Sequence, residues 1–319
     1  PVGAACYFFG ISAALAGLVA VRGDIFAPGG RPAPLSGRAV WFALAAIGQV
    51  VAFQLARPHH GWWSVFLPWA LSLLAAGAIV AAMTAVPVPR WLTAARLHRA
   101  ALVAVFGLAA LLRLAALETL PLAIHGDEGE FGLIALAVSE GRGPSPFGVA
   151  FLDDPAFYPH LLAPFITALG ASMTAIRLPS ALFGIAGVAL FYAFVRDLGG
   201  RRAGLIAAVL LASSAAHIHF SRVALNVVEA PFWVCLSMWL LWKGLATQRA
   251  LWSLLAGIAG GLGCYFHFSA RIVVPILALA LAWQWAARHL TARQFASAAA
   301  LVGVGGVLSL SPLLSHTLG

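Results

Sequence analysis

The sequence predicts an all-α polytopic membrane protein, and three observations support this fold class. Hydrophobic residues make up 62% of the 319 positions, whereas charged residues make up only 9%. Apolar runs of about 20 residues, the length of a helix that crosses the hydrocarbon core, recur along the chain. Short loops that contain Arg or Lys separate these runs. This composition lies far outside the range of water-soluble domains.

The positive net charge does not indicate a nucleic-acid partner. Although the formal net charge is +9, the basic residues are scattered among short loops and form no continuous stripe. Cys6, Cys235 and Cys264 all fall in apolar runs without paired spacing, so we expect neither a disulfide nor a zinc motif. The chain begins at Pro1 without a signal-peptide cleavage pattern and stops after an apolar run, and we expect it to be a fragment at one or both ends.

Ten membrane spans are predicted from the apolar runs. Their approximate ranges are 4–21, 38–56, 61–86, 99–119, 178–196, 201–218, 224–243, 250–267, 271–288 and 295–316. With the N-terminus outside, most of the 19 Lys and Arg residues fall in cytoplasmic loops, as the positive-inside rule requires. This arrangement predicts a multi-pass protein of the plasma (inner) membrane, with most carboxylates at the outer face.

A long outer loop, 120–177, separates the fourth and fifth spans. Residues 127–140 are predicted to form an amphipathic helix whose apolar face lies on the bilayer. That face comprises Phe131, Ile134, Ala135 and Val138. Residues 156–170 are apolar but short and contain two prolines, so we expect a juxtamembrane or half-inserted helix buried against protein. In the later span 250–267, four glycines, Gly257, Gly260, Gly261 and Gly263, are expected to allow close helix packing.

Carboxylates in the outer loop are the first candidates for chemistry. Asp127 and Glu128 follow a membrane span, where a carboxylate could remove a proton from an attacking acceptor. The alternative is a solvated acidic cap at a helix N-terminus. Asp153 and Asp154 precede Pro155 and could bind a divalent cation through oxygen ligands, or simply form a turn.

Two predicted outer turns each combine His and Arg. The first contains His217, His219 and Arg222, with Asn226 and Glu229 opening the next span; the second contains Tyr265, His267 and Arg271. Arg and His at this depth could hold a lipid phosphate through charge-assisted hydrogen bonds, or they could be snorkelling boundary residues. Arg177 is a candidate partner for an outer carboxylate. Arg113 and Glu118 have a spacing that allows them to be neighbours on one helix face.

In their order and spacing, these residues resemble the GT-C class of membrane glycosyltransferases, in the branch of protein O-mannosyltransferases and lipid A aminoarabinose transferases. The resemblance covers about 99–316 and leaves 1–98 as additional N-terminal helices. It rests on the pair Asp127-Glu128, the segment Asp154-Pro155-Ala156-Phe157-Tyr158-Pro159-His160-Leu161-Leu162, the segment Leu169-Gly170, the segment Arg177-Leu178-Pro179-Ser180-Ala181-Leu182, and the segment His219-Phe220-Ser221-Arg222.

The resemblance implies a GT-C-like helical bundle with a long outer loop that bears juxtamembrane helices. It also implies inverting transfer of a sugar from a polyprenyl-phosphate donor to an acceptor at the outer face. Asp127 matches the family's catalytic base and Glu128 its neighbour. Asp153-Asp154 stands where some relatives have Glu-Lys, and Asn226 where some have a second acidic residue, for which Glu229 could substitute. The family's later helices and outer C-terminal domain are missing from residues 99–319.

Our first hypothesis is therefore a glycosyltransferase with Asp127 as base and with Arg222, Arg271 and His267 on the donor phosphate. Its expected partners are the lipid-linked donor, membrane lipids and an acceptor that the sequence does not identify. No cofactor is required, although a divalent cation remains a candidate. The alternative is a non-catalytic GT-C-like scaffold subunit in a larger membrane complex. A lipid transporter ranks last, because the ionisable residues collect at one boundary instead of along a path across the membrane.

Overall fold

The computed structural model describes residues 94–148 and 155–318, and every regular element within these ranges is a helix. The predicted spans 4–21, 38–56 and 61–86 lie outside the described residues. The chain divides into two compact units, 1–104 and 105–319, and the description below concerns the second. Helix α4, Ala94–Leu114, begins in the first unit and ends in the second. The helices that follow are α5 Gly126–Ser139, α6 Phe157–Leu169, α7 Met173–Ser213, α8 Ala215–Phe220, α9 Glu229–Thr247, α10 Ala250–Gly263, α11 Val273–Ala286 and α12 Ala292–Leu318.

The long helices are those that the apolar runs predict. Four described segments are long and apolar enough to cross a membrane, namely Ala95–Leu114, Met173–Ser213, Phe268–Ala286 and Ala292–His316. The all-α polytopic membrane fold is therefore confirmed. The predicted span 250–267 is shorter in the structure, because α10 ends at Gly263 and the chain then turns into a short 3-10 helix, Phe268–Ile272.

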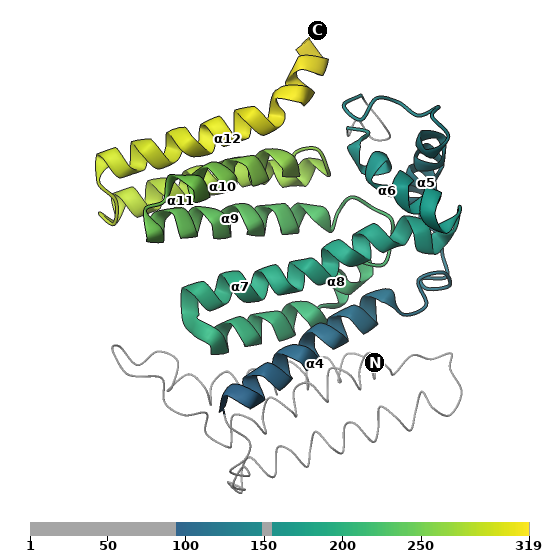
Figure 1. The fold of residues 1–319 in the computed structure, drawn as a ribbon, viewed down its shortest axis with the longest axis horizontal. Helices are drawn as coiled ribbons and strands as arrows, with labels where there is room; N and C mark the ends of the chain where they lie inside the picture. Colours follow the sequence, from purple (N-terminus) through teal and green to yellow (C-terminus); the bar gives the residue numbers. More distant parts are fainter. Residues whose placement is uncertain (1–93, 149–154, 319) are drawn as a thin grey trace, which may run out of the picture. The chain divides into compact units, whose positions relative to one another are not determined.

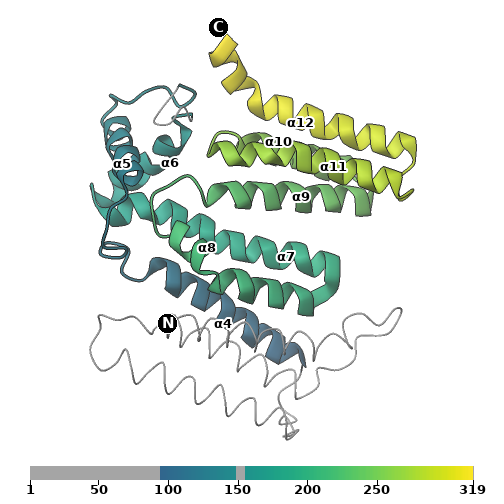
Figure 2. The ribbon, with the colours of Figure 1, turned by 180° about the vertical axis from the view of Figure 1, so that it is seen from behind.

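Helix α7 is two helical limbs joined at a sharp break. Gly200 lies there with φ of 86°, in the left-handed region that glycine adopts without steric cost. The two limbs run antiparallel and side by side (Figures 1 and 2). The first limb contains the predicted span 178–196, and the predicted basic turn follows it. The predicted span 201–218 is interrupted, because the second limb ends at Ser213 and the short helix α8 begins at Ala215.

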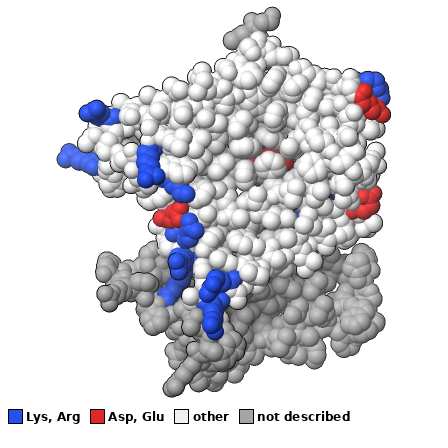
Figure 3. Space-filling view, in the orientation of Figure 1, with Lys and Arg blue, Asp and Glu red and all other residues white. Residues whose placement is uncertain are grey.

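The helices α9, α10, α11 and α12 run back and forth beside one another, so their connections alternate between two ends of the bundle (Figures 1 and 2). Helices α5 and α6 lie at the end where α9 begins. The turn of α7 and the connections α9–α10 and α11–α12 lie at the opposite end. Lys and Arg gather at this opposite end (Figure 3), as expected if one end of the bundle faces the cytoplasm.

Small residues bring α10 and α12 into close contact. A methyl group added at Gly257 would collide with the Val302 carbonyl, and one at Gly261 would collide with the Ser309 hydroxyl. The backbones can approach this closely only without side chains at these positions. The predicted packing role of the glycines is therefore confirmed at both sites.

Helices α5 and α6 pack on protein rather than on lipid. Phe131 and Ala135 of α5 are buried in one apolar cluster with Tyr158 and Leu162 of α6. The prediction that the face of α5 bearing Phe131 and Ala135 lies on the bilayer is therefore wrong, because α6 and α7 cover these two residues. The prediction that 156–170 forms a helix buried against protein is confirmed.

Candidate active site

The first turn of α5 holds Asp127 and Glu128, the two carboxylates that the sequence predicts to be catalytic. His125 caps this helix, since its Nδ1 accepts a hydrogen bond from the Asp127 backbone N–H at 3.3 Å. Asp127 and Glu128 both lie in the first turn, at the positive end of the helix dipole. Because successive helical residues point about 100° apart, the two side chains face different surroundings.

The Glu128 carboxylate is completely buried in a two-point ion pair with Arg177 of α7. Arg177 donates from Nε to Oε1 at 2.7 Å and from Nη2 to Oε2 at 2.9 Å. The Ala224 backbone N–H donates a third hydrogen bond to Oε1 at 2.8 Å. The Glu128 side chain is 0% exposed, and the Arg177 side chain is 1% exposed. The expected pairing of Arg177 with a carboxylate of the loop is confirmed.

The third guanidinium nitrogen of Arg177 holds the α4–α5 connection to the same point. Its Nη1 donates to the carbonyl oxygens of Leu117 at 2.9 Å and Pro121 at 3.3 Å. One guanidinium thus joins α7, the start of α5, and the segment that precedes α5. Glu128 accepts three hydrogen bonds and is shielded from solvent, so its geometry is that of a positioning residue.

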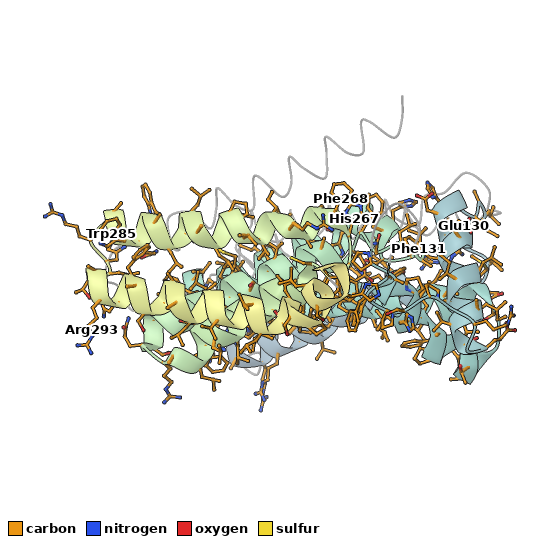
Figure 4. All side chains as sticks on the ribbon, turned by 90° about the horizontal axis from the view of Figure 1, so that it is seen from above. Glu130, Phe131, His267, Phe268, Trp285 and Arg293 are labelled. Atoms are coloured by element: carbon orange, nitrogen blue, oxygen red, sulfur yellow. The ribbon has the colours of Figure 1, made fainter. Side chains whose placement is uncertain are left out.

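Asp127 differs from its neighbour because it reaches the surface. Its side chain is 34% exposed, and Oδ2 lies 3.6 Å from His125 Nδ1. Figure 4 places Glu130 and Phe131 of the same helix at the end of the bundle that also holds His267 and Phe268. Glu130 is exposed and Phe131 is buried, so α5 keeps its apolar side inside and presents Asp127 and Glu130 outward.

A second polar cluster consists of Tyr158 of α6, Ser180 of α7 and Glu229 of α9. Ser180 lies about one helical turn after Arg177. The Tyr158 hydroxyl is 2.9 Å from Ser180 Oγ, and Ser180 Oγ lies 3.3 Å from both Glu229 Oε1 and the Leu225 carbonyl. All three side chains are 0% exposed, and Glu229 Oε2 has no hydrogen-bond partner among the described residues. Ser180 has a single proton to offer these two acceptors, and a proton on Glu229 would remove the competition between them.

The sequence pattern alone assigns no role to Tyr158 and Ser180. A signal was present, because Ser180 follows Arg177 by three residues and therefore shares its helix face. Asn226 is also buried, in the segment between Ala224 and Glu229. The structure thus joins Glu128 to Arg177 in one ion pair and places Glu229 in a separate polar cluster that begins one helical turn further along α7.

Arg222 binds backbone rather than a free site. In the last turn of α4, it donates to the Leu112 carbonyl oxygen at 2.8 Å. In the segment after α4, it donates to the carbonyl oxygens of Ala115 at 2.6 Å, Ala116 at 3.4 Å and Leu120 at 3.1 Å. Carbonyls at a helix C-terminus lack intrahelical partners, and Arg222 satisfies them. This geometry gives Arg222 a capping role.

Arg113 and Glu118 do not pair, because α4 ends at Leu114 and the helical spacing stops there. Arg113 is buried and donates to the Ala212 carbonyl at 3.2 Å and to His217 Nδ1 at 2.8 Å. Glu118 instead accepts hydrogen bonds from the Thr174 backbone N–H and hydroxyl, both at 2.8 Å. These bonds lower the pKa of the Glu118 carboxyl below its usual value near 4.5.

The other candidates divide into exposed and packed side chains. His219 and Arg271 are exposed. His267 caps the 3-10 helix by accepting from the Ser269 backbone N–H at 3.2 Å. Tyr265 is buried, and its hydroxyl donates to the Ser309 carbonyl at 2.6 Å.

His160 is half-buried and lies 2.8 Å from the Pro144 carbonyl, which fixes the loop after α5 against α6. Asp153 and Asp154 lie outside the described residues. Among residues 94–148 and 155–318, no group of three His, Cys, Asp or Glu side chains converges in a way that could hold a metal ion.

Comparison with known protein families finds a family that matches this chain. The family described as dolichyl-phosphate-mannose-protein mannosyltransferase matches residues 153–316, which run from before α6 to the last turn of α12 and include Arg177, Ser180 and Glu229. The Asp127-Glu128 pair precedes the matched residues, and the ion pair to Arg177 joins it to them. No curated protein and no solved structure matches the chain. The match covers half of the chain, which thus belongs to the dolichyl-phosphate-mannose-protein mannosyltransferase family, membrane glycosyltransferases of GT-C type.

Proposed function

We propose that the protein transfers a sugar from a polyprenyl-phosphate donor to an acceptor at the outer face of the plasma membrane, with inversion at the anomeric carbon. Membership of the family supports sugar transfer as the reaction. The distribution of Lys and Arg supports the outer face of the membrane as its location. Basic residues gather at the bundle end opposite α5 and α6 (Figure 3). If the positive-inside rule applies, α5 and Asp127 lie at the outer boundary.

The observation that carries the proposal is the fixed first turn of α5. The buried pair Glu128–Arg177 and the bond from Ala224 hold this turn, while Asp127 remains accessible beside it. A general base requires both properties, because it must meet the acceptor and must also be held in a constant position.

The proposed chemistry is a single displacement. The acceptor hydroxyl attacks the anomeric carbon and forms the new glycosidic bond, while Asp127 takes the hydroxyl proton. The bond from the anomeric carbon to the phosphate oxygen breaks, and the lipid phosphate leaves with the electron pair. No nucleotide site is needed, because the donor is already activated.

Cationic side chains at the same end would stabilise the leaving phosphate. Arg271 is exposed and His267 is partly exposed, which suits contact with a headgroup that arrives from the membrane. His219 is a further exposed candidate. Arg222 could contribute only by giving up carbonyls of the α4 terminus. Asp153 and Asp154 remain the proposed oxygen ligands of a divalent cation.

The proposal is tested with the purified chain in lipid nanodiscs. Polyprenyl-phosphate mannose and a nucleotide-linked mannose are offered separately to serine- and threonine-containing peptides and to a lipid acceptor. We expect transfer from the lipid-linked donor alone, with an inverted anomer in the product. Transfer from the nucleotide donor, or a retained anomer, would contradict the mechanism. A folded chain without any transfer would favour a non-catalytic scaffold subunit.

A further inference from the structure

A pocket at the bundle end opposite α5 has no role in the proposed transfer. It has a volume of about 200 Å³ and lies between the α9–α10 connection and the first turns of α12. Its polar lining includes Arg249, Arg293, Ser253 and Ser297, and its lining contains no carboxylate. Two guanidinium groups around one small cavity favour an anion.

The two arginines are available to a ligand. No described carboxylate forms an ion pair with Arg249 or Arg293. Asp197, in the turn of α7, is already engaged by Arg196 at 2.6 Å and by the Trp239 indole at 2.9 Å. Arg249 also precedes the N-terminus of α10, which has no side-chain cap, so the free N–H groups of that first turn add to the positive potential.

Hydrogen bonds between side chains and close helix packing hold the walls of the pocket. Gln294 of α12 donates to the side-chain oxygen of Gln248 at 2.9 Å, and Gln248 donates to the Leu245 carbonyl at 2.7 Å. Below them, α10 and α12 touch through Gly257. A site that is already formed loses little conformational entropy on binding.

The surroundings of the pocket indicate where its ligand comes from. Trp283 and Trp285 of α11 are 71% and 50% exposed, and Leu251 beside Arg249 is 58% exposed. Figure 4 places Trp285 and Arg293 at the same end of the bundle, away from Glu130 and Phe131. Exposed Trp beside Arg is typical of the headgroup region of a bilayer.

We propose that this pocket binds a phosphate group through Arg249 and Arg293, and that its source is the headgroup of an anionic phospholipid. Arginine recognises phosphate through paired N–H donors, and basic pockets between membrane helices bind such headgroups. A free phosphate has the same chemistry and is the alternative source. The site lies away from Asp127 and does not depend on the transferase proposal.

The experiment measures lipid binding by native mass spectrometry and by the shift in unfolding temperature in a neutral detergent. Phosphatidylglycerol, phosphatidylcholine and inorganic phosphate are titrated separately. Arg249→Gln combined with Arg293→Gln is compared with Arg201→Gln combined with Arg288→Gln, which removes equal charge outside the pocket. A third variant, Ser297→Glu, places a carboxylate in the pocket and leaves both arginines in place.

For the unaltered chain we expect phosphatidylglycerol to bind about tenfold more tightly than phosphatidylcholine. The pocket double variant and Ser297→Glu should both lose this preference, and the control double variant should keep it. Competition by millimolar inorganic phosphate would assign the site to the free anion, whereas lipid binding without such competition would assign it to the headgroup. Equal loss in the control variant, or equal binding of the two lipids, would overturn the proposal, whether or not the protein transfers sugar.

Discussion

The Arg177 guanidinium and the Glu128 carboxylate, 49 positions apart in the chain, meet through two parallel hydrogen bonds in a site closed to solvent. This pair fixes the start of α5 against α7, and with it the backbone of Asp127. A buried charge without its partner is costly. The geometry of the proposed base therefore depends on a contact that does not itself reach the substrate.

Glu128→Gln should strongly destabilise the protein, because it leaves the Arg177 charge buried and uncompensated. We expect the free energy of unfolding to fall by about 3–5 kcal/mol, measured by thermal unfolding in detergent. Glu140→Gln is the matched control, because Glu140 pairs with Arg142 at the surface and its loss should cost about 0–1 kcal/mol. Similar losses in the two variants would show that the buried pair has no special role.

Glu229→Gln should be well tolerated if Glu229 donates a proton to Ser180. The amide of glutamine can donate the same hydrogen bond, so the unfolding temperature should change little. Tyr158→Phe and Glu229→Leu each remove a hydrogen-bonding group from the buried cluster, and we expect losses of about 1–3 kcal/mol. If Glu229→Gln proves as damaging as Glu229→Leu, the carboxylate must be ionised and the hydrogen-bond pattern must be reassigned.

Gly257→Ala should separate α10 from α12, because the added methyl group collides with backbone that cannot easily move. The expected cost is about 1–3 kcal/mol. Gly303→Ala on α12 is the control, since nothing lies within 4 Å of its added methyl group. Thermal unfolding of both variants is the measurement, and equal stability would contradict the close packing of these helices.

Acid should weaken the contact between Glu118 and the start of α7. Because hydrogen bonds from Thr174 lower the pKa of Glu118, its contribution is fully present above the usual value near 4.5 and is lost as the pH falls through the lower folded value. Unfolding temperatures from pH 7 to pH 3 should therefore fall less in Glu118→Gln than in the unaltered chain. Parallel pH curves would exclude this contribution.

Local patterns predicted much of the fold. Apolar runs predicted α4, α7, α11 and α12, and the two prolines and short length of 156–170 predicted a helix buried against protein. The break at Gly200 falls in the predicted basic turn. These features follow from hydropathy, charge and backbone preference within a short window, and they need no knowledge of distant contacts.

The candidate site was less accessible to sequence reasoning. The sequence predicts a carboxylate partner for Arg177, but the choice of Glu128 depends on how α5 is rotated against α7. The sequence predicts Arg222 at a lipid phosphate, but in the structure Arg222 caps α4, because the end of that helix lies beside it. Tyr158 and Ser180 gain their roles only through packing of α6, α7 and α9, which no local pattern specifies.

The central claim is that Asp127 acts as the general base while Glu128 and Arg177 hold it in place. The most direct test compares Asp127→Asn with Glu130→Gln, a neighbouring exposed carboxylate on the same helix, in single-turnover transfer from polyprenyl-phosphate mannose. We expect Asp127→Asn to slow transfer by about 100-fold or more with donor binding retained, and Glu130→Gln to leave the rate within about twofold of the unaltered chain. Undiminished transfer by Asp127→Asn would contradict the claim.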